Sequence, residues 1–422
     1  MKTTVVMAAL AGLALSGAGL ARAEAPEPVL ETYSDIAAAA YADALATAGT
    51  LSGKIDALVE APSDETLADA RAAWIAARRP YQQTEVYRFG NALVDAWEGK
   101  VNAWPLDEGL IDYVDAGYGN ESPENAFYTA NVIANPTLKL GGRTIDASAI
   151  TPALLAEELQ EAGGIEANVA TGYHAIEFLL WGQDVNGTGA GAGNRPATDF
   201  DPDNCTGGNC ERRAAYLKAA TDLLIDDLAE MAEAWTAGGA ARADLAAKGP
   251  EGGLATILTG MGSLSYGELA GERIKLGLML HDPEEEHDCF SDNTHMSHLD
   301  DVVGMRNVWL GTYSGFATGS VEGASLRDYV AEGDPALADE MTAKLDATLA
   351  AFEAMRARAE TVEAYDQMIG EGNDEGNAVV QAGVDALVAQ TRTIEKVVTA
   401  LDLGAVAFEG SDSLDNPGVV FQ

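Results

Sequence analysis

Histidine, the side chain most often used to bind transition metals, is scarce and unevenly placed in this chain. Four of the five histidines fall within eighteen residues, at His281, His287, His295 and His298. The fifth, His174, stands three residues before Glu177. Residues three apart on a helix share a face, so this imidazole and this carboxylate could bind one ion. Glu284 and His287 repeat the spacing in the order E-x-x-H, which occurs in carboxylate-bridged metal bundles.

Each of these two segments also has a purely structural explanation. A His–Glu pair at helical spacing often makes only a hydrogen bond on a partly buried face. Asp282, Pro283 and Glu285 have the types and order of a helix start, where acids are favoured by the helix dipole. That explanation accounts for the acids but not for four clustered histidines.

The H-x-x-E pattern does not complete a zinc-peptidase motif. H-E-x-x-H requires Glu directly after the first histidine and a second histidine four residues on, where this chain has Ala175 and Phe178. H-x-x-E-H also requires histidine at the position of Phe178. A metal-dependent peptidase would need ligands from distant segments, with Glu177 as general base and His174 as ligand or proton shuttle.

Further carboxylates from other segments must complete a metal site near His174. Glu85 is the first choice, because it ends a helical stripe that also holds Trp74, Arg78 and Tyr81. The same stripe could instead be a core face with one buried ion pair. Asp107 is a loop candidate whose alternative role is to cap a turn.

Glu268 and Glu272, one helical turn apart, are a further pair of candidates, with pairing to Arg273, to Lys275 or to the earlier arginines as the alternative. His281, Glu284 and His287 complete the set of candidate ligands. Imidazole and carboxylate donors suit Fe(II), Fe(III), Mn(II) or Zn(II), and donor type alone does not select among them.

Helices are expected to position these residues, because apolar residues recur at helical spacing through most of the chain. The clearest case lies within 211–237, at Leu217, Ala220, Leu224, Leu228, Met231 and Trp235. Similar helices are expected over 254–280, 337–368 and 378–403, and another from Ser63 through a kink at Pro80 to beyond Tyr87. Strand-like alternation is nearly absent, so the sequence predicts an all-α fold.

Gly172 interrupts the helical sequence just before His174. A glycine inside a helix costs about 1 kcal/mol relative to alanine. Close approach of another backbone or of a ligand would explain why it is there.

The chain divides at a glycine-rich loop close to its middle. Residues 1–23 have the charged start, apolar run and A-x-A end of a signal peptide. The lengths that remain suit two helical bundles, with long irregular loops between helices. The expected parts are an N-terminal half over 24–185 that carries the H-x-x-E motif, the loop over 186–210 and a C-terminal half over 211–422.

The cysteines fit an oxidising compartment. Cys205 and Cys210 bracket a glycine-rich turn, which favours a disulfide, with metal binding as the weaker alternative. Cys289 is left as a free buried thiol or a ligand.

The charge balance limits the partners that the protein can have. With 25 Lys and Arg against 67 Asp and Glu, the formal net charge is −42, which argues against nucleic acid and anionic lipid as partners and favours cations. No window after the signal peptide is apolar for long enough to span a membrane. We therefore expect an exported protein without a transmembrane segment, in a bacterial periplasm.

The chain resembles the imelysin-like family and, within it, the branch called iron-regulated protein A. The resemblance rests on four stretches and covers most of the chain from about Tyr33 to Leu403. They are 87–91, 102–109, the G-x-H-x-x-E set within 172–184, and 272–287. It implies two helical halves with the motif helix lining a cleft between them, and a role as an exported, iron-regulated component of iron or haem acquisition. The family is also classed with metallopeptidases.

Together these observations predict a protein that binds iron or an iron complex in the periplasm as part of iron acquisition. Its expected cofactor is a metal ion, with iron ahead of zinc and manganese, and its partner would be a periplasmic or membrane component of iron uptake. The alternatives are a metal-dependent peptidase and a metal-free protein that binds a peptide or another organic ligand.

Overall fold

The computed structural model describes residues 25–140 and 142–421; the predicted signal peptide lies outside these ranges. Helices dominate this part of the chain, and the strands form only two short antiparallel hairpins. The predicted all-α fold is therefore confirmed.

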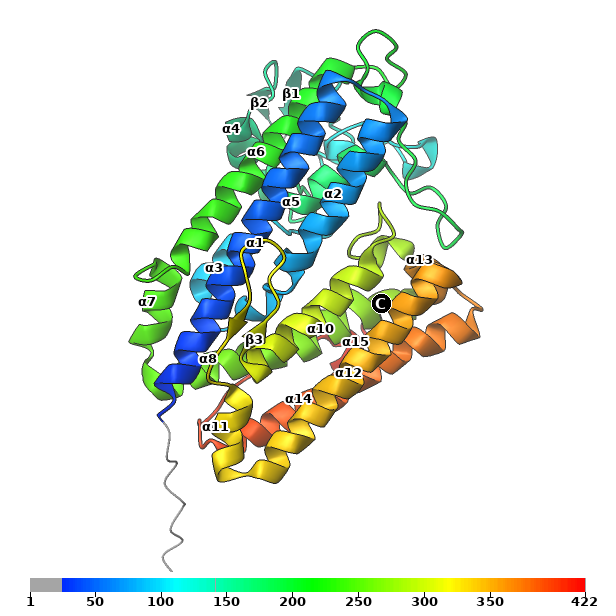
Figure 1. Ribbon diagram of the computed structural model, residues 1–422. Coiled ribbons are helices and arrows are strands. Elements are labelled where there is room, and N and C mark those ends of the chain that lie inside the picture. The colour runs from blue at the N-terminus through cyan, green and yellow to red at the C-terminus, as the bar shows by residue number, and fades with distance from the viewer. Residues whose placement is uncertain (1–24, 141, 422) are drawn as a thin grey trace, which may run out of the picture.

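The first group of helices packs around α1, which is long and rich in alanine (Figure 1). Its buried face holds small and aromatic residues such as Ala37, Ala40, Tyr41 and Ala44, which allow close packing of α2 and α6 against it. This group contains α1 (Glu27–Glu60), α2 (Asp64–Gln82), α3 (Ala92–Glu98), α5 (Gly172–Trp181), α6 (Cys210–Ala234) and α7 (Ala240–Ala247).

The second group packs around the antiparallel pair α12 and α14 (Figure 1). It contains α8 (Gly249–Ser263), the π-helical η7 (Leu264–Lys275), α9 (Leu276–Leu280), α10 (Thr294–Leu310), α11 (Leu326–Gly333), α12 (Pro335–Thr361), α13 (Tyr365–Ile369), α14 (Asp374–Ala400) and α15 (Asp412–Asp415). α10 also packs against α2, which joins the two groups.

Short elements fill the connections between these helices. The 3-10 turns are η1 (Glu85–Tyr87), η2 (Glu108–Leu110), η3 (Ala116–Tyr118), η5 (Ala162–Gly164), η6 (Ala197–Phe200) and η8 (Pro283–Glu285). A one-turn helix α4 (Pro152–Leu154) leads into the π-helical η4 (Leu155–Leu159). The hairpins pair β1 (Thr137–Leu140) with β2 (Arg143–Asp146), and β3 (Thr312–Tyr313) with β4 (Val321–Glu322).

Two helix boundaries differ from those that the sequence predicts. The helix that begins after Ser63 ends at Gln82 and does not run past Tyr87, because Pro80 lies in its last turn and Thr84 donates its hydroxyl to the Tyr81 carbonyl at 2.6 Å. The predicted helix over 337–368 is two helices, α12 and α13, which are separated at 362–364.

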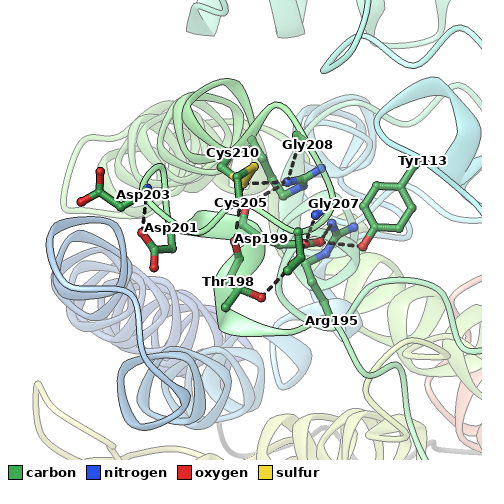
Figure 2. The surroundings of a disulfide bond; sticks show 12 residues. Tyr113, Arg195, Thr198, Asp199, Asp201, Asp203, Cys205, Gly207, Gly208 and Cys210 are labelled. Atoms are coloured by element: carbon green, nitrogen blue, oxygen red, sulfur yellow. Dashed lines mark hydrogen bonds and ion pairs between the residues drawn. A yellow bond between two sulfur atoms is a disulfide. The ribbon is translucent and has the colours of Figure 1, made fainter.

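The glycine-rich loop is held to the first group of helices. Cys205 and Cys210 form a disulfide, as the sequence predicts, and Cys289 is a free, buried thiol. Figure 2 shows how Asp199, next to this disulfide, accepts hydrogen bonds from Tyr113 at 2.6 Å and Arg195 at 3.1 Å. The helix that follows the loop, α6, packs on α1 and α5, so in space the first group of helices extends beyond the loop.

Candidate metal centre

A close backbone contact at its N-terminus positions the helix that carries His174. Gly172, its first residue, has a φ of +77°, and a Cβ there would lie 2.4 Å from the Val101 carbonyl oxygen. The next amide, that of Tyr173, donates to the same oxygen at 2.8 Å. The close backbone approach predicted for Gly172 is therefore present. All ten residues of α5 are buried, so the motif faces the interior of the molecule.

His174 and Glu177 share one face of α5 and contact each other. His174 Nδ1 lies 3.1 Å from Glu177 Oε2. The other oxygen, Oε1, accepts hydrogen bonds from the backbone N–H of Ser291 at 3.0 Å and from its hydroxyl at 2.7 Å. The remaining imidazole nitrogen, Nε2, is buried and has no partner. A carboxylate on Nδ1 favours the tautomer whose Nε2 carries a lone pair, as in metal-bound histidines.

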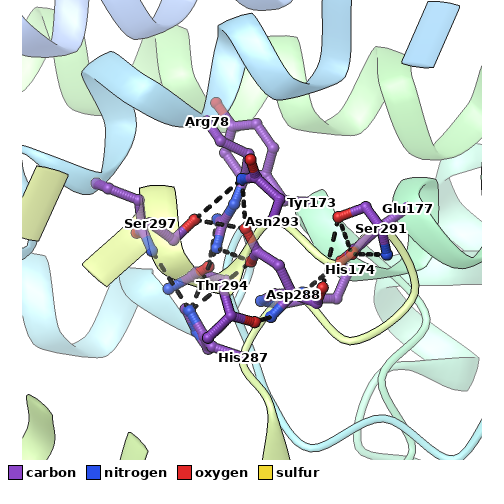
Figure 3. Close-up of polar contacts among 12 residues, drawn as sticks. Arg78, Tyr173, His174, Glu177, His287, Asp288, Ser291, Asn293, Thr294 and Ser297 are labelled. Atoms are coloured by element: carbon purple, nitrogen blue, oxygen red, sulfur yellow. Dashed lines mark hydrogen bonds and ion pairs between the residues drawn. The ribbon is translucent and has the colours of Figure 1, made fainter. Parts of the chain in front are cut away.

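The irregular segment ahead of α10 brings a second set of donors to the same place. The imidazole rings of His287 and His174 are 4.8 Å apart between centroids. His174, His287 and Asp288 each offer one ligand atom, and these three atoms lie within 4.8 Å of one another. We call these three residues the His–His–Asp cluster. Figure 3 shows α5 and the segment that carries His287, Asp288 and Ser291 meeting at this point.

Asp288 is fixed by contacts to both of its oxygens. Arg78, from α2, donates to Oδ1 at 2.7 Å, while Asn293 donates to Oδ2 at 2.8 Å and Ser297 also donates to Oδ2. Arg78 is itself held by Asn102 at 2.6 Å. Each carboxylate oxygen has two lone pairs, so these contacts orient Asp288 and leave it able to bind an ion.

Burial and nearby charges together set the charge of the cluster residues and of Glu177. Burial and the nearby Arg78 lower the pKa of His174 well below its usual value, and burial does the same for His287, so both imidazoles are neutral near pH 7. Although burial raises the pKa of Asp288, the Arg78 guanidinium brings it down to about 2. Burial, and then repulsion by Asp288, raises the pKa of Glu177.

The chemistry of these donors fits a transition metal. Two imidazoles and one carboxylate with open positions are the donor set of non-haem Fe(II) sites. The unpartnered Nε2 of His174 is costly in a buried position unless a ligand occupies it. Arg78 adds a positive charge beside the cluster, which Asp288 offsets through its ion pair.

Glu85 lies in a different buried cluster from the one predicted. It pairs with Arg273 at 2.6 Å, and Arg273 also pairs with Glu268 at 2.8 Å and Asp301 at 3.3 Å. Glu85 therefore takes part in a buried ion pair, which was its alternative role. Glu268 pairs with an arginine, which was likewise the alternative to metal binding for that residue. Glu272 is exposed.

The other predicted residues contact partners outside this centre. Asp107 is half-buried and accepts a hydrogen bond from Asn125. His281 contacts the Ile369 carbonyl at 2.6 Å through Nδ1. Glu284 lines a separate small pocket. Of the candidate set, the structure brings together His174, Glu177 and His287.

Asp288, Arg78 and Ser291 belong to this centre although the sequence alone did not single them out as parts of it. Asp288 directly follows His287, and an acid next to one of the clustered histidines could have been recognised in the sequence as a candidate ligand. Nothing in the spacing indicates that Arg78 and Ser291 would hold the two carboxylates, because these contacts join segments far apart in the chain.

Comparisons with known proteins agree on one family. The model of the imelysin family, which also carries a peptidase label, matches residues 37–394. Iron-regulated protein A of Synechococcus elongatus is 28% identical over 110 residues, which cover 25% of this chain and 31% of that protein. The matched stretch thus spans less than a third of this curated relative.

Two solved structures share the fold. One, from Parabacteroides distasonis, is described as an iron-regulated protein A precursor; it has a TM-score of 0.64 and 18% identity, with 92% of this chain and 97% of that chain covered. The other, an imelysin-like protein from Psychrobacter arcticum, has a TM-score of 0.57 and 18% identity, with 92% and 100% covered. In the described part of the chain, no helix combines the length and apolar character needed to cross a membrane.

Proposed function

The chain belongs to the imelysin family, and we propose that it binds an iron ion outside the cytoplasm through His174, His287 and Asp288. The observation that carries this proposal is the convergence of three buried ligand atoms within 4.8 Å, one of them from a histidine whose Nε2 has no partner. Two imidazoles and a carboxylate favour Fe(II) over calcium or magnesium, which prefer oxygen donors alone.

The surroundings of the cluster also suit a bound ion. Glu177 orients His174, and Ser291 orients Glu177, in the same way that outer partners fix the ligands of known metal sites. Arg78, Asn293 and Ser297 do the same for Asp288. Such contacts hold the donors in place before the ion arrives, which reduces the ordering that binding requires.

Burial favours a single ion over haem or another large iron complex. His174 and Asp288 have no exposed area, and His287 is 2% exposed. The half-buried Trp104 packs against both imidazoles, with its ring 5.1 Å from that of His174 and 6.4 Å from that of His287. The same closure disfavours a peptidase, because a polypeptide substrate would have to reach the metal and Glu177 already accepts two hydrogen bonds from Ser291.

Export and a role in iron acquisition are parts of the same proposal. The signal-peptide pattern over 1–23 and the Cys205–Cys210 disulfide support an oxidising compartment such as the periplasm. The relatives named for iron regulation support iron as the metal. A component of iron uptake in the periplasm or membrane would then receive the ion.

Anaerobic titration of metal-free protein with Fe(II), followed by desalting and metal analysis, tests the proposal. We expect one tightly held Fe(II) per wild-type chain. His174→Ala and His287→Ala should each lose it, because each removes one of the three donors and fewer donors hold the ion more weakly.

His281→Ala is the matched control, since this histidine lies outside the cluster and its Nδ1 contacts a backbone carbonyl. It should retain the ion. Equal iron content in all four proteins, or none in the wild type, would overturn the proposal. Loss of chelator-sensitive peptide hydrolysis in Glu177→Gln would instead support the peptidase alternative.

A further inference from the structure

A second polar site lies close to the His–His–Asp cluster but uses different residues. It is a small pocket lined by Asp184, Pro283, Glu284, Glu286, Cys289, Phe290 and Asp366, which we call the acidic pocket. Four of these seven residues are acids and none is basic. They come from three places: the segment after α5, the segment over 281–293, and α13.

Two of its carboxylates are buried with oxygens that lack partners. Asp366 is 1% exposed, and neither of its oxygens has a well-formed hydrogen bond, although the nearby amide of Gln367 lowers its pKa somewhat. Glu286 is also 1% exposed; Thr294 donates to its Oε2 at 2.8 Å, but Oε1 has no partner. Unpaired buried carboxylate oxygens destabilise the folded state unless a proton or a cation neutralises them.

Electrostatics around the pocket adds to this cost. Burial, followed by repulsion from Asp184, raises the pKa of Asp366 to about 7. Asp292, which is not part of the lining, has its pKa raised to about 7 by burial and then by repulsion from Asp366 and Asp184. No arginine, lysine or histidine lines the pocket, so the charge on these acids is not balanced by a cationic side chain of the lining.

We propose that the acidic pocket binds a hard divalent cation of the calcium class, through Glu286 and Asp366 with Asp184 and Glu284 at its rim. Its oxygens are the donors that such ions prefer. The lining contains no imidazole, and its four carboxylates outnumber its single thiol, Cys289, so the donor set favours a hard cation over a soft transition metal.

The volume of the pocket and the separation of its oxygens limit what it can bind and how. The pocket has room for about one water-sized guest, which suits an ion and excludes an organic ligand. In the described ranges, the residues whose metal-ligand atoms already lie within 4.8 Å of one another in a group of three are those of the His–His–Asp cluster, outside this pocket. The oxygens of the acidic pocket are farther apart than that, so binding of an ion requires a small movement of the 281–293 segment that brings them closer together.

A cation here would link parts of the fold that also build the His–His–Asp cluster. Asp184 follows the helix that carries His174, and Glu286 directly precedes His287. Asp366 belongs to α13 in the second group of helices. Occupation of the acidic pocket would therefore restrain the segment that presents His287 and Asp288, while using none of the donors of the iron site.

Calcium titration of chelator-treated protein, by calorimetry and by thermal unfolding, tests this proposal. We expect saturable binding of one Ca²⁺ and a rise in Tm in the wild type. Asp366→Asn and Glu286→Gln should each weaken Ca²⁺ binding by at least about tenfold, since each removes a charged ligand. Without calcium, the same variants should have a Tm equal to or above that of the wild type, because an unbalanced buried charge is gone.

Three further variants separate binding in the pocket from binding to surface acids or to the His–His–Asp cluster. Asp222→Asn removes an exposed acid of α6 and should leave Ca²⁺ binding unchanged, as should His174→Ala. Asp184→Asn changes a half-buried rim residue and gives a milder loss, which provides a readout if a core variant does not fold. Wild-type-like Ca²⁺ binding in Asp366→Asn, Glu286→Gln and Asp184→Asn, or no saturable binding in the wild type, would overturn the proposal.

Discussion

At the scale of single residues, the orientation of the His174 imidazole depends on one neighbour, Glu177. Glu177 contacts Nδ1 and is itself held by two hydrogen bonds from Ser291. The imidazole is therefore oriented with its unpartnered Nε2 directed away from this contact. Glu177 acts through His174 in our proposal, as a positioning residue.

Glu177→Gln should therefore weaken Fe(II) binding by about 10–100-fold, the range usual for loss of an outer carboxylate partner. The amide keeps the size of the side chain, but with its one oxygen on Ser291 its NH2 group would face Nδ1 and favour the tautomer with the proton on Nε2. Competition with a coloured chelator under anaerobic conditions measures the change. Glu272→Gln, at an exposed position of η7, is the control and should bind as the wild type does; an equal affinity in both variants would show that Glu177 has no positioning role.

The residue types of the centre were partly predictable from sequence. The H-x-x-E spacing and the clustered histidines identify His174, Glu177 and His287, because local spacing on a helix or within one segment is visible in the chain. Glu85 illustrates what is not visible: its partner, Arg273, is 188 residues away. Whether a buried carboxylate meets a metal or an arginine depends on packing between distant helices.

At the scale of elements, the start of α5 fixes where His174 points. At Gly172 the backbone passes close to Val101, with a positive φ that residues other than glycine rarely adopt. A substitution there would shift the helix relative to the segment that carries His287. Gly49 is different: it is exposed in the middle of α1, its backbone is helical, and a Cβ there would meet nothing within 4 Å.

Gly172→Ala should destabilise the protein by at least about 1–3 kcal/mol, from the positive φ alone, with the contact to the Val101 oxygen adding to it. Gly49→Ala should have the opposite effect and stabilise α1 by about 0.5–1 kcal/mol. Denaturant unfolding followed by circular dichroism compares the two. A Gly172→Ala midpoint equal to that of the wild type would mean that the close approach to Val101 can relax at little cost.

The elements themselves were more predictable than their ends. Amphipathic spacing locates α6, α12 and α14, because a helix that buries one face must repeat apolar residues at its own period. The same spacing cannot distinguish α-helix from π-helix, so the stretch over 264–275 reads as an ordinary helix although its geometry is π-helical. The end of α2 at Gln82 depends on side-chain contacts as well as on Pro80.

At the scale of the whole molecule, a formal charge of −42 places many acids close together, both on the surface and inside. Glu98 is an example outside both proposed sites. It is buried on α3 and lies 3.8 Å from Arg88, in the cluster that also contains Glu85, Glu268 and Arg273. Burial, and then repulsion by Glu85, raises its pKa to about 7 despite Arg88 and Arg273.

This predicts that metal-free protein becomes more stable as the pH falls from about 8 to about 6.5, because the folded state then binds protons that the unfolded state does not. Below about 6.5 the rise should become less steep, since the buried histidines, with lowered pKa values, bind fewer protons than in the unfolded chain. Glu98→Gln should raise the Tm near pH 8 and reduce the slope, measured in chelator across this range. The same slope in Glu98→Gln and in the wild type would show that Glu98 ionises in the folded protein as it does in the unfolded chain.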